Sequence, residues 1–218
     1  MHSGASSPLS GTVVFRAATQ RDAAALAPLV FASGEREFCY LLGASPHECT
    51  EFLQYAIALP SGRFSWRRHR VADVGGEPVA VLSIQDGRAN LLDDARIAHS
   101  FMRHFGFART IGIIPRALIL DSEIPAPVRK QTLLAHCATR ADMRGTGVFS
   151  ALFEDTLRRQ LVPAHASQDL VLDTLLSNTG AAMLYRRLGF VELSKRPLRS
   201  KRLPIELRSV RMAYRGVA

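Results

Sequence analysis

Apolar residues recur along the chain with two different periods. Alternating or continuous apolar runs predict strands at 13–19, 66–74, 78–86, 131–140, 170–175, 189–194 and 206–214. Spacing of three to four residues predicts helices at 21–32, 45–59, 90–107, 148–161 and 178–190. The turn 75–77 joins two of the strands into a hairpin.

Local signals support several helix ends. Thr19 and Asp22 have the spacing of a capping box, and Ser45 followed by Pro46 is typical of a helix start. Gly189 is a stop signal for the helix at 178–190. Residues 33–44 are expected to connect the first two helices.

Residues 108–130 are harder to assign. Pro115, Pro125 and Pro127 predict that no long element continues through them. This segment and the helix before it form an enlarged, partly helical connection around 90–130.

The order of elements indicates the fold class. Strands and helices alternate in the second half of the chain, which predicts an α/β fold with a largely central sheet. An apolar content of 47% supports a substantial core, and no low-complexity tract divides the 218 residues. We therefore expect a flexible segment at 1–10 and a single domain over 11–218.

Composition excludes several classes of protein. The first residues lack the charged start and apolar block of a secretion signal, and no apolar run is long enough to span a membrane. The three cysteines have no ligand spacing, so neither a disulfide scaffold nor a metal site is expected. These features fit a cytoplasmic protein.

The net charge of +9 is concentrated near the end of the chain. Eight Lys or Arg residues lie between 195 and 215, against the single acid Glu206. Such a cluster attracts anions, namely nucleic acid, a phosphorylated cofactor or an acidic substrate, unless it is only a solvated loop. Nucleic acid is the weaker option, because no aromatic platform or recognition helix accompanies the charge.

A glycine turn precedes the helix at 148–161. In "ADMRGTGVFSALFEDTLRRQ" (141–160), Gly145 and Gly147 allow close approach to the backbone, and the first N–H groups of the helix lack intrahelical partners. Arg144 adds a positive charge. The turn is therefore either a phosphate cradle or an ordinary strand-to-helix turn.

Two common phosphate motifs fit this turn poorly. A P-loop would need Gly-Lys-Ser/Thr, which is absent. A dinucleotide fingerprint would need a third glycine where Ser150 stands. Dinucleotide binding is therefore the least favoured reading.

The passage "LLAHCATRADMRGTGVFSALFEDTL" resembles the acetyl-CoA-binding motif of the GNAT superfamily of acyltransferases, R/Q-x-x-G-x-G/A. Arg144 and Gly147 match, whereas Phe149 departs from the family's small residue. "NTGAAMLYRRLGF" is similar to a second signature of that family, at the matching distance. The resemblance is specific over about 133–190.

The resemblance implies a GNAT-like mixed, mostly antiparallel sheet flanked by helices, and acetyl-CoA as cosubstrate. It implies that the strand at Cys137, Ala138 and Thr139 pairs with the pantetheine arm. It also implies that the turn holds the pyrophosphate through Arg144 and the N–H groups of Gly145, Thr146, Gly147, Val148, Phe149 and Ser150. Asn178 is a helix cap or a contact to the same arm.

Catalytic roles follow less directly. Tyr185 matches the general acid of the family, which would protonate the leaving thiolate. His136 and Glu123 are candidates for the general base, with Asp173 or a water-mediated path as alternatives. By the same analogy, Glu35 and Glu37 would lie near the acceptor site.

We therefore expect an acetyl-CoA-dependent N-acetyltransferase that transfers directly to an amine in a ternary complex. The alternative is a non-catalytic module that binds CoA or an anionic partner on the same fold. The expected acceptor is a small-molecule or peptide amine, with no membrane partner. A homodimer is compatible with these expectations.

Overall fold

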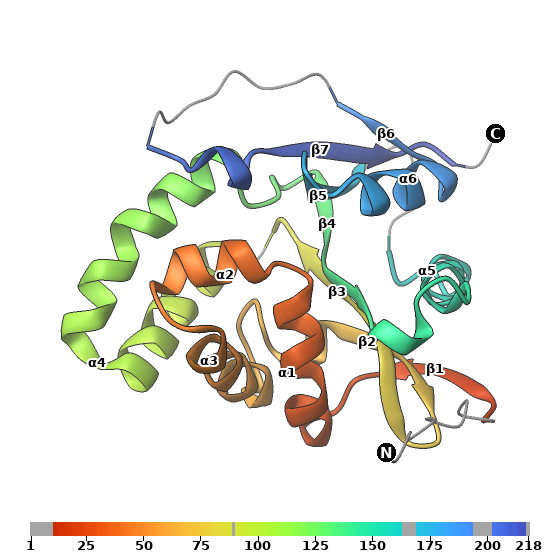
Figure 1. Ribbon diagram of the computed structural model, residues 1–218, viewed down its shortest axis with the longest axis horizontal. Helices are drawn as coiled ribbons and strands as arrows, with labels where there is room; N and C mark the ends of the chain where they lie inside the picture. The colour runs from red at the N-terminus through yellow and green to blue at the C-terminus, as the bar shows by residue number, and fades with distance from the viewer. Residues whose placement is uncertain (1–10, 89, 163–168, 194–201, 217–218) are drawn as a thin grey trace, which may run out of the picture.

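A single seven-stranded sheet organises the protein, in the order β1-β2-β3-β4-β5-β7-β6. The computed structural model describes residues 11–88, 90–162, 169–193 and 202–216 (Figure 1). The strands are β1 (Val13–Ala17), β2 (His69–Val74), β3 (Glu77–Asp86), β4 (Gln131–Thr139), β5 (Asp169–Leu175), β6 (Phe190–Glu192) and β7 (Ser209–Tyr214). Neighbouring strands are antiparallel except for β4 and β5, so the predicted mixed, mostly antiparallel sheet is confirmed.

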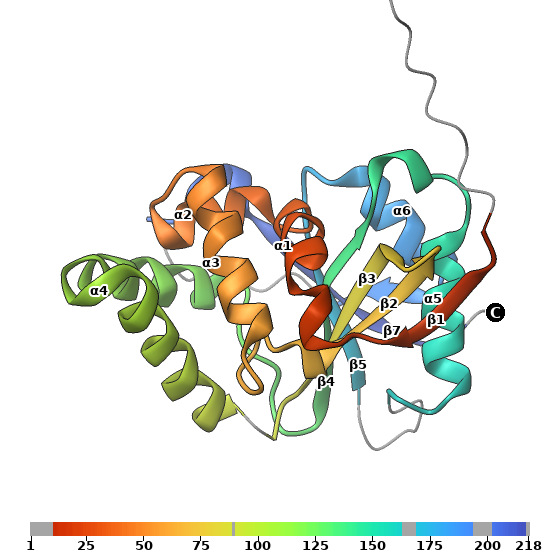
Figure 2. The ribbon, with the colours of Figure 1, turned by 90° about the horizontal axis from the view of Figure 1, so that it is seen from below.

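Helices cover both faces of this sheet. The helices α1 (Ala23–Ala32), α2 (Glu35–Leu42), α3 (Pro46–Ala58) and α4 (Asn90–Glu123) gather on one side, as Figure 2 shows. The helices α5 (Val148–Arg158) and α6 (Thr179–Arg187) lie on the other.

Strand alternation divides the apolar core between the two faces of the sheet, with a first core on the side of α1 and α3 and a second core on the side of α5. Val71 and Val81 pack with α1 and α3, whereas their chain neighbours Ala72 and Leu82 pack with α5. All four side chains are fully buried.

Helix α2 is an element that the sequence analysis placed in a connection. It begins after Gly34 and ends at Gly43, which adopts a left-handed φ of 57°. Phe38 and Leu42, four residues apart, are buried against the first core. Two helical turns are too short for their periodicity to stand out in the sequence.

The helical connection is longer than the prolines predicted. Helix α4 continues to Glu123, with Pro115 inside it, and it bends at Gly106, where φ is 77° and ψ is 172°. Arg116 donates to the carbonyls of Leu41 and Leu42 at 3.0 and 3.1 Å. A cation at these unpaired carbonyls caps α2 and ties it to α4.

The parallel strands β4 and β5 pair over only part of their length. Gln131–Leu134 pair with Asp169–Leu172, and beyond this point each strand pairs only with its other neighbour. The register of β4 against β3 shifts between Ala135 and Ala138. His136 lies in this bulge with a φ of 52°, a conformation rare for a residue with a side chain. The bulge lies where the strands part and leave the β5-facing edge of β4 without a strand partner.

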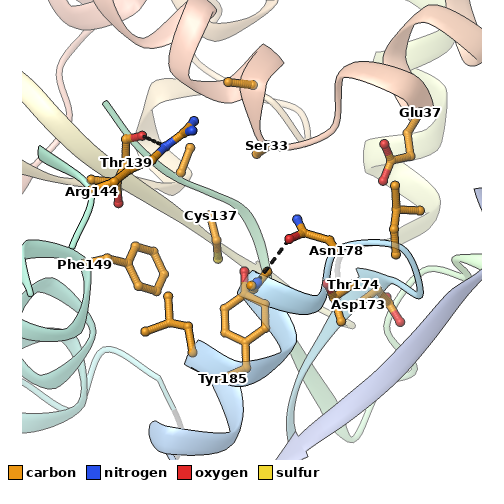
Figure 3. Close-up of a pocket in the computed structure, with 16 residues that line it drawn as sticks. Ser33, Glu37, Cys137, Thr139, Arg144, Phe149, Asp173, Thr174, Asn178 and Tyr185 are labelled. Carbon is orange, nitrogen blue, oxygen red and sulfur yellow. Dashed lines mark hydrogen bonds between the residues drawn. The ribbon is translucent and has the colours of Figure 1, made fainter. Parts of the chain in front are cut away.

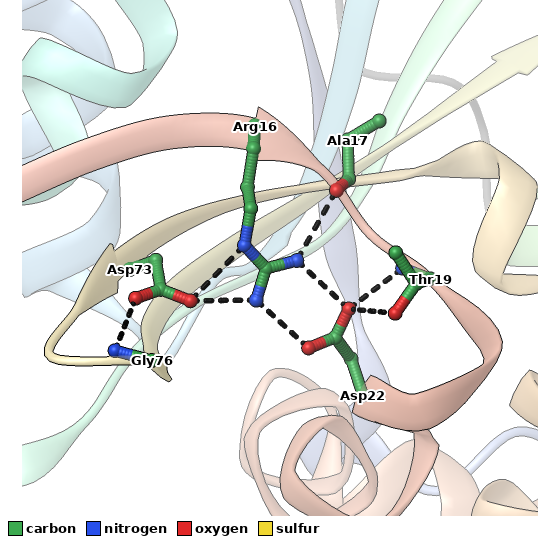
Figure 4. Close-up of polar contacts among 6 residues, drawn as sticks. All are labelled: Arg16, Ala17, Thr19, Asp22, Asp73 and Gly76. Atoms are coloured by element: carbon green, nitrogen blue, oxygen red, sulfur yellow. Dashed lines mark hydrogen bonds and ion pairs between the residues drawn. The ribbon is translucent and has the colours of Figure 1, made fainter.

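An ion network at the other end of the sheet joins β1, β2 and the start of α1 (Figure 4). The Arg16 guanidinium donates to Asp22 at 2.8 Å and to Asp73 at 2.6 Å. Asp22 also accepts the Thr19 N–H at 2.6 Å, as the capping box predicts. The hydrogen bond from Arg16 lowers the pKa of Asp22 to about 2.

Asp22→Asn should destabilise the protein at neutral pH. Removing one partner of a buried ion pair costs about 3–5 kcal/mol, and we expect about 1–2 kcal/mol because Arg16 is partly exposed and keeps Asp73. A depressed pKa gives stability that is present above the unfolded value, 3.8, and is lost as the pH falls toward 2. The difference between wild type and variant in denaturant unfolding should therefore shrink below pH 4. Glu154→Gln, at an exposed site, is the control, and an equal loss in both variants would contradict the prediction.

Candidate functional site

A cavity of about 430 Å³ opens where β4 and β5 part. Cys137, Ala138 and Thr139 line it from β4, and Asp173, Thr174 and Leu175 line it from β5. Figure 3 shows its other labelled walls, which come from the glycine turn, α5, α6 and the α1–α2 region. The complete set of these other lining residues is Ala32, Ser33, Glu37, Arg144, Phe149, Asn178, Gly180, Ala181, Leu184 and Tyr185.

The glycine turn has the free donors that a phosphate cradle requires. Gly145 and Gly147 have φ values of 78° and 82°, and a Cβ on either would meet no atom within 4 Å. Among the described residues, no acceptor pairs with the backbone N–H groups from Gly145 to Ser150. Arg144 lines the cavity and donates to the carbonyl of Thr139 at 3.3 Å. The positive end of the α5 dipole and Arg144 together favour an anion here.

Phe149 packs into the protein while its backbone stays at the cradle. The side chain is 7% exposed and belongs to the core cluster with Leu152 and Phe153. One part of the ring also lines the cavity. The bulky residue therefore fills the core and leaves its own N–H unpaired.

Tyr185 and Cys137 meet inside the cavity. Figure 3 shows the Tyr185 hydroxyl directed toward the Cys137 side chain, and both residues line the cavity. Burial raises the pKa of the Tyr185 phenol well above 10 and the pKa of the Cys137 thiol to about 12. Both groups are therefore protonated at neutral pH.

Asn178 caps α6. Its side-chain oxygen accepts the Ala181 N–H at 3.1 Å, which confirms the capping role. The same residue lines the cavity, so it is also within reach of a ligand there.

The two candidate bases named first do not line this cavity. His136 lies in the bulge, where its Nδ1 is 3.0 Å from His69 Nε2 and its ring stacks on Phe64. Desolvation lowers the pKa of His136 well below 6.5. Glu123, at the end of α4, accepts the Ser209 N–H at 2.9 Å and holds the start of β7.

Asp173 does line the cavity, but its charge is already compensated. Arg211 donates to its two oxygens at 2.9 and 2.7 Å. Arg215 similarly pairs with Asp169 at 2.9 Å. These two members of the basic C-terminal cluster thus bind β5, while residues 195–201 lie outside the described part.

Glu37 is a cavity residue that the sequence analysis placed only by analogy, without a helix to present it. The first turn of α2 brings its side chain to the cavity. The spacing of Phe38 and Leu42 is the sequence signal that could have predicted α2 and, with it, the position of Glu37.

Two further features bear on the class of site. The described residues contain no cluster of His, Cys, Asp and Glu that could hold a metal ion. Within the same part of the chain, no helix is both long and apolar enough to cross a membrane.

The sequence matches no protein-family model and no curated protein. Solved structures do match. An acetyltransferase is 21% identical, covers 94% of this chain and 100% of its own, and has a TM-score of 0.64. An N-acetyltransferase from Staphylococcus aureus Mu50 has a TM-score of 0.65 at 14% identity, over 92% of this chain and 99% of its own. A GNAT-family acetyltransferase from Streptococcus pneumoniae has a TM-score of 0.50 at 16% identity, over 95% and 100%.

The chain has the fold of the GNAT acetyltransferases. Its likeness to these structures confirms the resemblance seen in the two sequence signatures. The cavity suits an acetyl-CoA molecule chemically, since a free N–H cradle with open space at both glycines lies beside an unpaired strand edge. A pyrophosphate and an amide-containing arm are the groups that such donors and acceptors bind.

Cys137 should react slowly with iodoacetamide in the native protein. Because only the thiolate is nucleophilic, a thiol pKa of about 12 predicts alkylation at pH 8 about two to three orders of magnitude slower than in the denatured chain. Peptide mapping by mass spectrometry over time would measure both rates. Equal rates in native and denatured protein would show that the thiol is not desolvated.

Proposed function

We propose that the protein is an acetyl-CoA-dependent N-acetyltransferase that transfers acetyl directly to an amine in a ternary complex. The observation that carries this proposal is the position of the Tyr185 phenol in a cavity between two parted strands, beside a cradle of free N–H groups. A phosphate-bearing thioester and a proton donor for its sulfur would meet there.

The residues that would hold acetyl-CoA follow from the cavity walls. The unpaired edge of β4 at Cys137–Thr139 would pair with the pantetheine amides, and the N–H groups of Gly145–Ser150, with Arg144, would hold the pyrophosphate. Acetyl-CoA would supply the acetyl group as an activated thioester.

Tyr185 is suited to protonate the departing sulfur. A thiol has a pKa near ~8.5 in water, below that of a phenol at ~10, so in water this transfer would be unfavourable. In the cavity, burial raises the pKa of the Cys137 thiol to about 12 and the pKa of the Tyr185 phenol well above 10. A sulfur placed beside Cys137 would share this desolvation, so the thiolate that forms as the C–S bond breaks would be a stronger base than in water, and the protonated Tyr185 phenol would be the donor beside it.

Tyr185→Phe tests the role of the phenol. Removing a general acid should lower kcat by about 10²–10⁴-fold while the dissociation constant for acetyl-CoA stays within twofold. Release of free thiol with a panel of amines measures turnover, and calorimetry measures binding. Tyr214→Phe is the matched control, since Tyr214 packs in the same core cluster and does not line the cavity. Unchanged turnover would remove Tyr185 from the mechanism.

Arg144→Glu tests the cradle. Exchanging a cation for an anion at the helix start should weaken CoA binding about 10- to 100-fold, the value of a charge-assisted hydrogen bond plus the repulsion introduced. Arg88→Glu is the control, because Arg88 is exposed and follows β3 near the start of β4, away from the cavity. Equal affinities in the two variants would place the pyrophosphate elsewhere. CoA binding without acetyl transfer to any amine would favour the non-catalytic module.

A further inference from the structure

Glu37 contributes a carboxylate with one oxygen that the described residues leave without a partner. Its Oε2 atom is buried and has no hydrogen-bond partner among the described residues. The side chain lines the same cavity as Tyr185. Figure 3 shows it at the opposite end of the cavity from Arg144.

A buried carboxylate oxygen without a partner is costly, so its position calls for an explanation. Burial raises the pKa of Glu37, against the opposing effects of a hydrogen bond from its own backbone N–H and of the neighbouring Arg36 charge. Asp173, the other acid in the cavity lining, is neutralised by Arg211. Glu37 is therefore the acid at this site that remains available to a ligand.

We propose that Glu37 binds the acceptor as an ammonium ion and accepts its proton, and that the acceptor is an aliphatic amine with no carboxylate beside the amino group. This inference rests on the proposed acetyl transfer and adds the acceptor class to it.

The charges of the cavity wall support this class. Arg144 is the one cationic side chain among the described lining residues, and it lies at the cradle end. An ammonium group placed at Glu37 gains an ion pair in a partly desolvated site. The carboxylate of an α-amino acid would lie close to Glu37, where no cation of the described cavity lining could pair with it, so such acceptors are disfavoured.

The proton transfer also completes the reaction. The ammonium group gives one proton to the Glu37 carboxylate, and the nitrogen lone pair becomes free to form the C–N bond with the acetyl carbon as the C–S bond breaks. Tyr185 gives its proton to the sulfur and is restored by the second proton of the nitrogen. Glu37 then releases its proton to water, so one amide, one thiol and one proton result from an ammonium ion and a thioester.

Pentylamine and norleucine test the inference without turnover. The two molecules share a carbon chain and an amino group, and only norleucine carries a carboxylate beside it. Calorimetry should show that wild-type protein binds pentylamine at least 10-fold more tightly than norleucine. Glu37→Gln should lose at least 10-fold in pentylamine affinity. Glu154→Gln, at an exposed acid on α5 that does not line the cavity, should keep wild-type affinity.

Acetyl transfer supplies the second measurement. Glu37→Gln should lower kcat/KM for pentylamine by about 100-fold, the effect of a lost general base, with acetyl-CoA affinity unchanged. Absence of transfer by wild-type protein to any amine would overturn the proposed function, and the binding series would still judge Glu37. Wild-type pentylamine affinity in Glu37→Gln, equal binding of norleucine, or no binding of either amine would overturn the assignment of Glu37.

Discussion

The partial separation of β4 from β5 is the constraint on which the site depends. A parallel pair that continued to the ends of both strands would close the cavity and satisfy the β4 edge. The bulge at His136 lies where the pairing ends. A left-handed conformation at a non-glycine residue costs of order 1–3 kcal/mol and requires compensation from its surroundings. The His69 hydrogen bond and the Phe64 stacking supply such contacts to the His136 ring.

His69 and His136 hold this bulge through a hydrogen bond between two neutral rings. His69 Nδ1 lies 2.9 Å from the Ser65 carbonyl, so it carries the proton, and Nε2 accepts from His136. Desolvation lowers the pKa of His69 to about 4 and the pKa of His136 well below its usual value. Both rings are therefore neutral across the physiological range, and their hydrogen bond holds the bulge without burying a charge. The sequence makes His136 a candidate base, whereas in the structure its ring supports the bulge of β4.

Features whose interacting residues are close together in the sequence could be predicted, and features that depend on distant residues could not. The glycine turn and the Asn178 cap lie within a few residues of their partners, and the structure contains both. Helix α2 was missed because its two apolar residues mean little until the first core is assembled. Pro115 suggested that the helix would end there, because a proline destabilises the helical turn that contains it. The burial of Ile113 and the contacts of Arg116 with α2 stabilise the helix through residues distant in the sequence, which the local pattern does not show. The burial of Glu37 Oε2 without a hydrogen-bond partner depends on α2, β4 and β5 together, and no pattern within one segment could reveal it.

Helix α4 supports the Glu37 end of the cavity through α2, whereas the cradle end is built on other elements. Arg116 of α4 holds the carbonyl end of α2, and α2 presents Glu37. The cradle depends instead on β4 and α5, whose positions the sheet and the second core determine. A change in α4 would therefore move the Glu37 end of the cavity relative to the cradle end. On the proposed function, the cradle would bind groups common to every CoA thioester, and selectivity for the acceptor would reside in α2 and in the α4 segment that supports it.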